Sequence, residues 1–402
     1  MQTYRLSNGM QVIYNKKDTD SVTAEIMVRV GSNYENPKIS GISHMIEHLV
    51  FEATKKYRGS LELANEVEKL GGELNAYTSE ERTAYYVKIV RKHLDKALDI
   101  LEQIIFNPLF RESDIEKERS IIIDEIRLVT DEPRFHQWIL FAKNLFIKHP
   151  AKNPAYGTVK AVKTITRKDI LDYYSKYYIP NNMIISVAGK ADDLKQKLEK
   201  ALGGYRAKNI VSRKKVIEPR QARPKTTREK RKLSNSYLIF GYKTPPRLHK
   251  DSYALDILRA ILGRGQSGKL FYEIRTKLGL AYEVGVHHNP STDYGFFAVY
   301  CGTDRKNIDK IRDVIIKELK LKALDDNMIK EAKDYIEGNF SLENEDTKDL
   351  SDQAAFWALM GDPEGINSYI RKIRSITKKD IQKAIKRYFT ENYTLTILEQ
   401  TT

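Results

Sequence analysis

Two segments of the chain, 211 residues apart, carry the same pattern. Residues 164–189 read TITRKDILDYYSKYYIPNNMIISVAG, and residues 375–399 read SITKKDIQKAIKRYFTENYTLTILE. Each segment predicts a helix that is capped by a threonine and followed by an apolar strand. Each half of the chain also starts with a strand (TAEIMVRV or SYLIFGY), followed by a helix, a Gly-containing turn, paired strands and long helices. The repetition indicates two domains built on one plan.

The strand patterns indicate the kind of sheet in these domains. RTAYYVKIV (82–90) and YGFFAVYC (294–301) alternate in polarity, whereas strands buried in a parallel sheet are apolar throughout. We therefore expect an α+β fold with two duplicated domains. Each should hold a mainly antiparallel sheet that is covered on one face by helices.

A strongly basic segment lies near the middle of the chain. Residues 206–232 contain 12 Lys or Arg and 2 Glu, so they carry most of the formal net charge of +15. The segment also contains two prolines and no apolar periodicity, which is typical of a linker. We predict an N-terminal domain over 1–205, a basic linker over 206–232 and a C-terminal domain over 233–402.

The basic segment raises nucleic-acid binding as a rival function. No zinc finger, RNA-recognition signature or basic heptad accompanies it, so we expect no nucleic-acid partner. Binding to heparin or DNA that survives physiological salt would favour the rival.

The amino-acid composition also indicates in which cellular compartment the protein is found. Cys301 is the only cysteine, which excludes an intramolecular disulfide and favours a reducing interior. No apolar run has the length of a membrane span, and the first residues predict two strands around an Asn-Gly turn rather than a signal peptide. We expect a cytoplasmic protein with no membrane partner.

In the first domain, the stretch GISHMIEHLVFEAT (41–54) contains several side chains that can bind a metal ion or transfer protons. Its apolar residues have the spacing of an amphipathic helix, and His44, Glu47 and His48 lie together on an adjacent face. Two imidazoles one turn apart can bind one metal ion, although a solvated helix surface gives the same pattern. The corresponding helix of the second half, DSYALDILRAILG, contains no histidine, and this asymmetry favours the metal site.

A second stretch offers carboxylates. Residues 112–128, ESDIEKERSIIIDEIRL, predict a helix with Glu118 and Glu125 two turns apart on one face. They lie roughly 10 Å apart along the axis, so both can hardly bind one ion. One would be a ligand and the other would orient a ligand, unless both are surface charges of a Glu-rich helix.

Two other motifs suggest a phosphate-binding loop and a second metal site, but neither has the residues or the geometry required. GRGQSGK (263–269) nearly matches a phosphate-binding loop, but Leu270 replaces the magnesium-binding hydroxyl and a helix, not a strand, precedes it. His287 and His288 are adjacent on a predicted strand, so their side chains point to opposite faces and cannot easily share a metal.

Taken in order along the chain, these motifs resemble the inverted zinc-protease family M16, also called pitrilysin-like or inverzincin. His44-Met-Ile-Glu47-His48 is followed 77 residues later by Glu125 within ERSIIIDEI. GGELNAYTSEERTAYY (71–86) resembles the substrate-strand segment of the family, and LGRGQSGKLFYEIRTKLGLAY (262–282) resembles its Gly-rich loop and Arg–Tyr motif. The layout is similar to the short subfamily, which includes the mitochondrial processing peptidases.

The resemblance implies a function for each matching residue. Zinc would be bound by His44, His48 and Glu125, and Glu47 would be the general base that takes a proton from the attacking water. Glu118 would orient ligands or water. An edge strand with Asn75 and Ala76 would hold the peptide in extended form, and Arg275 and Tyr282 would hold its backbone from the second half.

It also implies an assembly. Two similar halves form half of a clamshell in this family, and short members work as pairs of chains that enclose unfolded peptides. Because this chain carries both motif sets, we expect a homodimer, with a heterodimer of related chains as the alternative. Family members that lost the motif become non-catalytic assembly subunits, which is the other rival function.

One departure concerns specificity. The processing peptidases hold a substrate arginine with acidic residues ten and fourteen positions after the zinc glutamate. Here these positions are Phe135 and Ile139. We therefore expect no strict dependence on arginine, and a preference for aromatic or apolar side chains.

Overall fold

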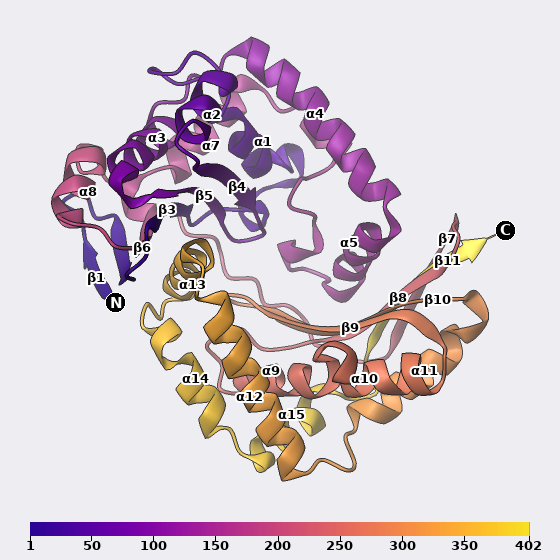
Figure 1. The fold of residues 1–402 in the computed structure, drawn as a ribbon. Helices are drawn as coiled ribbons and strands as arrows, with labels where there is room; N and C mark the ends of the chain where they lie inside the picture. The colour runs from indigo at the N-terminus through magenta and orange to yellow at the C-terminus, as the bar shows by residue number, and fades with distance from the viewer. Residues whose placement is uncertain (402) are drawn as a thin grey trace. The chain divides into compact units, whose positions relative to one another are not determined.

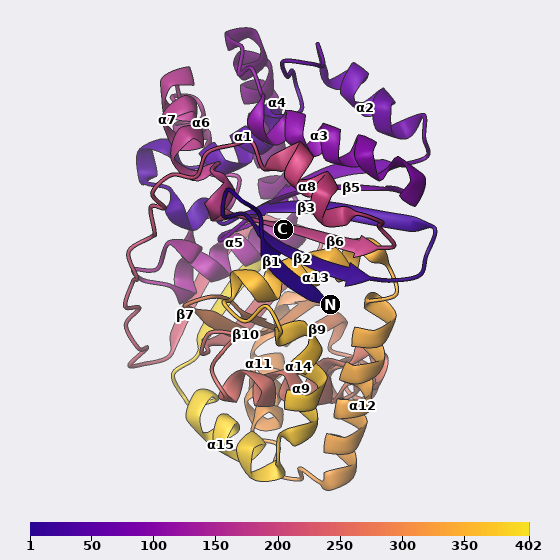
Figure 2. The same cartoon turned by 90° about the vertical axis from the view of Figure 1, so that its left-hand side faces the viewer.

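A computed structural model describes residues 1–401 and divides the chain into two compact units (Figures 1 and 2). Unit 1 comprises Met1–Leu128, Asn153–Lys214 and Leu342–Ile366, and unit 2 comprises Val129–Lys152, Lys215–Ser341 and Asn367–Thr402. Each unit contains one β-sheet with helices packed on it.

Unit 1 is built on a six-stranded sheet in the order β1-β2-β6-β3-β5-β4. Only β2 and β6 pair in parallel; the other neighbours are antiparallel. Its strands are β1 (Gln2–Arg5), β2 (Gln11–Lys16), β3 (Ser21–Val28), β4 (Glu73–Thr78), β5 (Thr83–Val90) and β6 (Met183–Gly189). Its helices are α1 (Ile42–Leu49), α2 (Ser60–Glu68), α3 (Leu94–Phe106), most of α4 (Glu112–Asp131), α6 (Val159–Val162), α7 (Arg167–Tyr177), α8 (Leu194–Leu202) and α13 (Thr347–Leu359).

Unit 2 repeats this plan with a five-stranded sheet in the order β7-β11-β8-β10-β9. Here β7 and β11 are the parallel pair, in the place that β2 and β6 have in unit 1. Its strands are β7 (Lys225–Lys232), β8 (Ser236–Lys243), β9 (Ala281–Pro290), β10 (Gly295–Thr303) and β11 (Thr394–Thr401). Its helices are α5 (Pro133–Leu145), α9 (Asp251–Gly263), α10 (Lys269–Phe271), a π-helical turn (Tyr272–Lys277), α11 (Ile308–Leu319), most of α12 (Asp326–Glu343), most of α14 (Gly365–Ser375) and α15 (Lys378–Tyr388).

The duplicated α+β fold predicted from the sequence is therefore confirmed. The repeated cap is also present: the Thr166 and Thr377 side chains each accept a hydrogen bond from the backbone N–H of the third residue of the helix, Asp169 or Asp380, at the start of α7 and α15. In unit 1 the main core lies between the sheet and α1, α3, α7 and α8.

Two helices are exchanged between the halves of the sequence. α13, from the second half, packs on the face of the unit 1 sheet opposite the main core, where the Thr23 and Thr347 hydroxyls are 2.9 Å apart. α5, from the first half, packs on the sheet of unit 2, where Phe141 and Leu145 join a cluster with Ile239. Both sheets thus carry helices on two faces, so the expectation that helices cover only one face of each sheet was wrong.

This exchange corrects the predicted domain boundaries. Residues 129–152 belong to unit 2 although they precede residue 205, and residues 342–366 belong to unit 1. The predicted linker over 206–232 is also too long, because its last eight residues form strand β7. Charged side chains on an edge strand disfavour pairing with another chain.

Within residues 1–401, every helix is too short or too polar to cross a membrane.

Candidate metal centre

Helix α1 carries the HxxEH motif and is fixed at its start. Gly41 precedes it with a φ of 97°, a conformation that favours glycine. The carboxylate of Glu35 accepts hydrogen bonds from the backbone N–H groups of Gly41, at 2.6 Å, and Ser43, at 2.9 Å. Burial raises the pKa of Glu35 to about 7, and these hydrogen bonds act in the opposite direction. Glu35 thus supplies the helix cap that α1 lacks locally.

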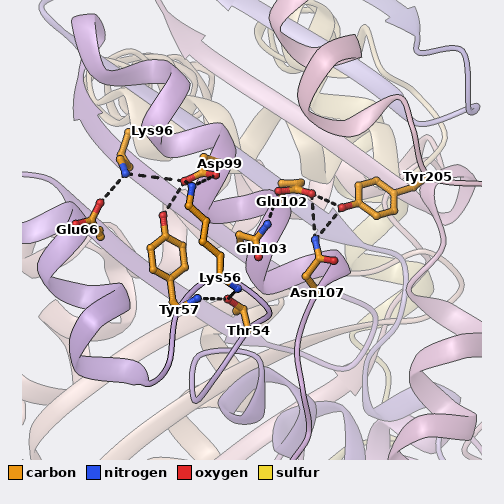
Figure 3. A network of polar contacts seen from close by, with 10 residues as sticks. All are labelled: Thr54, Lys56, Tyr57, Glu66, Lys96, Asp99, Glu102, Gln103, Asn107 and Tyr205. Atoms are coloured by element: carbon orange, nitrogen blue, oxygen red, sulfur yellow. Dashed lines mark hydrogen bonds and ion pairs between the residues drawn. The ribbon is translucent and has the colours of Figure 1, made fainter.

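The chain that follows α1 is fastened to α3 by polar contacts (Figure 3). The Thr54 hydroxyl accepts from the Tyr57 N–H at 2.9 Å, and the Tyr57 hydroxyl donates to Asp99 on α3 at 2.7 Å. Lys56 forms an ion pair with the same carboxylate at 2.5 Å. Both ends of α1 are therefore attached to the body of unit 1.

Three side chains converge beside α1. The Nε2 atoms of His44 and His48 are 3.3 Å apart, and Glu125 of α4 places Oε2 3.6 Å from the first and 3.7 Å from the second. Among residues 1–401, these three form the one His, Cys, Asp or Glu group arranged to hold a metal ion. Tetrahedral ligands at the ~2.0–2.1 Å of zinc bonds lie roughly 3.3 Å from one another. The triangle therefore fits one ion.

Glu118 lies on the other side of His48. Its Oε2 is 2.8 Å from His48 Nδ1, so it can hold the ring with Nε2 directed at Glu125. Burial acts to lower the pKa of His48, but the hydrogen bond to Glu118 and the nearby carboxylates outweigh it and raise that pKa. Burial and the charge of His48 lower the pKa of His44 to about 3, so His44 is neutral, as a metal ligand must be.

Glu47 lies on the same helix and is 9% exposed. Burial raises the pKa of its carboxyl group, while a hydrogen bond from the Thr78 side chain and the charge of His48 act in the opposite direction. Its Oε2 is buried and lacks a hydrogen-bond partner among residues 1–401, as does Nδ1 of His44. Buried polar atoms without partners are rare and mark sites that bind something further.

Strand β4 forms an edge of the sheet and contacts α1. Asn75 and Ala76 lie on this strand, as predicted. The Ala76 N–H donates to the side-chain oxygen of Asn75 at 2.8 Å, and β4 has a neighbouring strand on one side only. An added strand could replace that local hydrogen bond.

The remaining predicted residues belong to unit 2. Arg275 lies in the π-helical turn, 5.0 Å from the Phe271 ring centroid, and is exposed. Tyr282 lies at the start of β9 and is 38% exposed. Phe135 on α5 is 61% exposed, and Ile139 is half-buried. The substrate-binding roles of these four residues remain predictions, because the three side chains that could bind the metal lie in unit 1.

The helix of unit 2 that corresponds to α1 carries an ion pair. Asp256 is the sixth residue of α9, as Glu47 is of α1. It accepts from Arg247 at 2.7 and 3.1 Å, and from Nδ1 of His288 at 2.7 Å. His287 contacts the Trp138 ring of α5 instead, so the two adjacent histidines do point to opposite faces.

Sequence patterns missed Glu35 and Thr78. Glu35 lies six residues before the helix that it caps, outside the spacing of local capping motifs. Thr78 reaches Glu47 only because β4 runs beside α1. Neither residue has a sequence signal that separates it from its neighbours.

The sequence comparisons agree with this geometry. Residues 11–159 match the family described as Insulinase (Peptidase family M16), and residues 164–335 match the Peptidase M16 inactive domain. An uncharacterized zinc protease of Rickettsia bellii is 30% identical over 98% of this chain and 96% of its own length. The chain belongs to peptidase family M16. An uncharacterized zinc protease of Bacillus subtilis is 28% identical to this M16 chain over 99% of it and 98% of the relative.

Solved structures share the M16 fold of this chain. A protease from Helicobacter pylori superposes with a TM-score of 0.94, at 26% identity and with 99% of both chains covered. A peptidase M16 inactive domain from Pseudomonas fluorescens gives a TM-score of 0.90 at 16% identity, covering 100% of this chain and 98% of that one. The family resemblance inferred from the motifs is confirmed.

Proposed function

We propose that this M16 protein is a zinc-dependent endopeptidase that hydrolyses unfolded peptides held in extended conformation. The observation that carries the proposal is the triangle of His44, His48 and Glu125 with the buried Glu47 carboxylate beside it. Two imidazoles and one carboxylate are a ligand set that zinc peptidases use, and three protein ligands leave a position for water or substrate.

Zinc is the metal that these residues suit best. The spacing of the three ligand atoms fits tetrahedral zinc, and the relatives in Rickettsia bellii and Bacillus subtilis are named zinc proteases. When bound, zinc polarises the scissile carbonyl and lowers the pKa of water toward neutrality.

The protein's own side chains would carry out the proton transfers and the positioning. Glu47 would take a proton from the attacking water and return it to the leaving amine, and its raised pKa suits a base that works near neutral pH. Glu118 would keep His48 oriented through its 2.8 Å contact with Nδ1. The free edge at Asn75 and Ala76 would pair with the peptide backbone.

We expect a working unit of two chains, most simply a homodimer, that encloses unfolded peptides in a chamber. Light scattering should give the mass of two chains, and the enzyme should cut a peptide of a few tens of residues but spare a folded protein. Cleavage should stop when a chelator is added. A fully active monomer, or rapid digestion of the folded protein, would contradict the chamber.

Arg275 and Tyr282 are proposed to hold the substrate backbone. Arg275→Ala and Tyr282→Phe should lower kcat/KM for peptides without lowering zinc content, because both residues belong to the unit without metal ligands. Arg312→Ala, which removes another arginine of unit 2, is the control. Unchanged kcat/KM in both variants would make these residues structural only.

Substrate preference is expected to be aromatic or apolar. The positions of the family's arginine pocket hold the exposed Phe135 and the half-buried Ile139, which offer no charge to an arginine. A peptide library should therefore show no requirement for arginine, whereas the double variant Phe135→Glu, Ile139→Glu should shift the profile toward arginine. A wild-type profile that demands arginine two residues before the cut would contradict this prediction.

We favour the enzyme over a non-catalytic assembly subunit, because the three proposed ligands lie together and Glu47, the proposed base, lies on the same helix as two of them. We place the enzyme in the cytoplasm, since the single buried cysteine is compatible with a reducing compartment. Fractionation of cells with an antibody to the protein tests the location.

A further inference from the structure

Strand β4 contacts a helix on each face of the unit 1 sheet. Ala76 packs against the main core, and β4 contacts α1 on that side. Neighbouring side chains of a strand point to opposite faces, so the next residue, Tyr77, points away from the core. Its hydroxyl donates a hydrogen bond to Oδ1 of Asp352, which lies on α13. The strand with the predicted peptide edge is therefore held by α1 on one face and by α13 on the other.

Arg82 adds to the contact between β4 and α13. Its Nε donates to the Tyr77 hydroxyl at 2.8 Å. Its guanidinium carbon lies 5.3 Å from the centroid of the Tyr77 ring and 5.2 Å from that of Phe356, which is also on α13. The Arg82 carbonyl accepts from the Ser79 N–H at 2.8 Å, in the turn between β4 and β5. Arg82, Tyr77 and Asp352 thus form one chain of hydrogen bonds with a charged group at each end.

Two other contacts of α13 are made farther from the free edge of the sheet. The Ser351 hydroxyl donates to the carbonyl of Ser186 on β6 at 3.1 Å, and the Thr347 hydroxyl is 2.9 Å from that of Thr23 on β3. The sheet order places β5 between β3 and β4, and β6 lies beyond β3. Of these three contacts, that of Asp352 is the one made to the edge strand.

The position of β4 matters for the proposed reaction. A peptide that adds to the free edge takes its register and its depth from β4. Tyr77 lies between Ala76 and Thr78, the two residues whose side chains point toward α1, the helix with the HxxEH motif. A shift of Tyr77 toward or away from α13 would therefore shift the peptide edge relative to the metal helix. Misplacement of a substrate by about 1 Å can cost roughly 100-fold in rate.

We infer that Asp352 of α13, acting through the Tyr77 hydroxyl, holds β4 in the position that a peptide substrate requires. The inference rests on the proposed function in taking the free edge of β4 as the peptide site. Asp352 and Tyr77 are then positioning residues, because both act through the strand and not on the metal or the scissile bond. They are 275 positions apart in the sequence, so no local pattern reveals the pair.

Asp352→Ala and Tyr77→Phe test the inference through the kinetics of peptide cleavage. Each should lower kcat/KM by roughly 10–100-fold, mainly through a higher KM, because the edge binds the peptide backbone before the chemical step. Zinc content should stay unchanged, since neither residue belongs to the metal triangle. The double variant should be no worse than the single ones, because both remove the same contact. Asp352→Glu, which keeps the carboxylate, should restore part of the loss.

Ser351→Ala is the matched control on the same helix. It removes the contact of α13 with β6 and leaves that with β4, so it should lower the Tm but keep the KM of the wild type. Hydrogen exchange of residues 73–78, measured by mass spectrometry, should be faster in Asp352→Ala and unchanged in Ser351→Ala. A role in stability alone would reduce the fraction of folded protein, and so lower kcat without raising KM.

An unchanged KM in Asp352→Ala, or an equal rise of KM in Ser351→Ala, would overturn the inference. A wild type that cuts no peptide would contradict the proposed function instead. The exchange measurement would then decide whether Asp352 holds the strand: faster exchange of residues 73–78 in Asp352→Ala than in Ser351→Ala would support it, and equal exchange in the two variants would overturn it.

Discussion

Glu47→Gln is expected to lower kcat/KM for peptide cleavage by roughly 10²–10⁴-fold, the usual loss when a general base is removed. Zinc content should stay at the wild-type level, because Glu47 lies outside the triangle of ligand atoms. The amide has nearly the shape of the carboxylate, so the fold of α1 should not change. Only the ability to accept a proton is lost.

His48→Ala provides the contrast on the same helix. It removes one of the three ligand atoms, so both zinc and activity should be lost. Metal content by atomic emission and cleavage of one fluorogenic peptide, measured on both variants, separate the two roles. Near-normal turnover in Glu47→Gln would exclude Glu47 as the base, and loss of zinc in that variant would make it a ligand.

Asp256→Ala is expected to destabilise unit 2 by about 3–5 kcal/mol, the usual cost of removing one partner of a buried ion pair. Asp256 is 6% exposed, and it forms two hydrogen bonds with the buried Arg247 and one with His288. The chain has two tryptophans, one in each unit, at positions 138 and 357. Urea unfolding followed by Trp138 fluorescence in a Trp357→Phe background therefore reports on unit 2 alone.

The same pair predicts a dependence on pH. Burial acts to raise the pKa of Asp256, but the charge of Arg247 and the hydrogen bond from His288 outweigh it and hold that pKa below its usual value. A lowered pKa stabilises the fold above the unfolded-state value of about 4, and this stabilisation is lost as the pH falls further. The difference between wild type and Asp256→Ala should thus narrow below about pH 4.

Lys168→Ala is the control for that measurement. Lys168 forms an exposed ion pair with Asp172 in unit 1, and such pairs contribute little. It should leave the urea midpoint of unit 2 unchanged. An Asp256→Ala protein as stable as the wild type would contradict the prediction that this ion pair supports the fold of unit 2.

The sequence predicted which helices and strands form better than it predicted which of them pack together. Periodicity and the repeated Thr-capped helix indicated both sheets and their helices. Hydrophobic periodicity can show that a helix buries one face, but it does not show that α5 and α13 each pack on the sheet of the other half. β7 was missed for a different reason: as an edge strand it alternates charged residues with half-buried ones, so it has no apolar pattern to detect.

The metal site, too, could be predicted from the sequence only in part. His44, Glu47 and His48 share a helix face, so their grouping could be inferred from spacing. Glu125 could be chosen over Glu118 only through the family resemblance, and the structure places Glu125 in the triangle and Glu118 behind His48. Glu35 and Thr78 reach the site from other segments through tertiary contacts, which local patterns do not encode.

The most direct test of the zinc peptidase is a titration of metal-free protein with zinc while peptide cleavage is measured. One site formed by His44, His48 and Glu125 predicts that activity rises linearly and stops rising at one zinc per chain. A matched Glu125→Gln protein should show no such end point at the same concentrations. Full cleavage activity before any zinc is added, or the same end point in Glu125→Gln, would contradict the account.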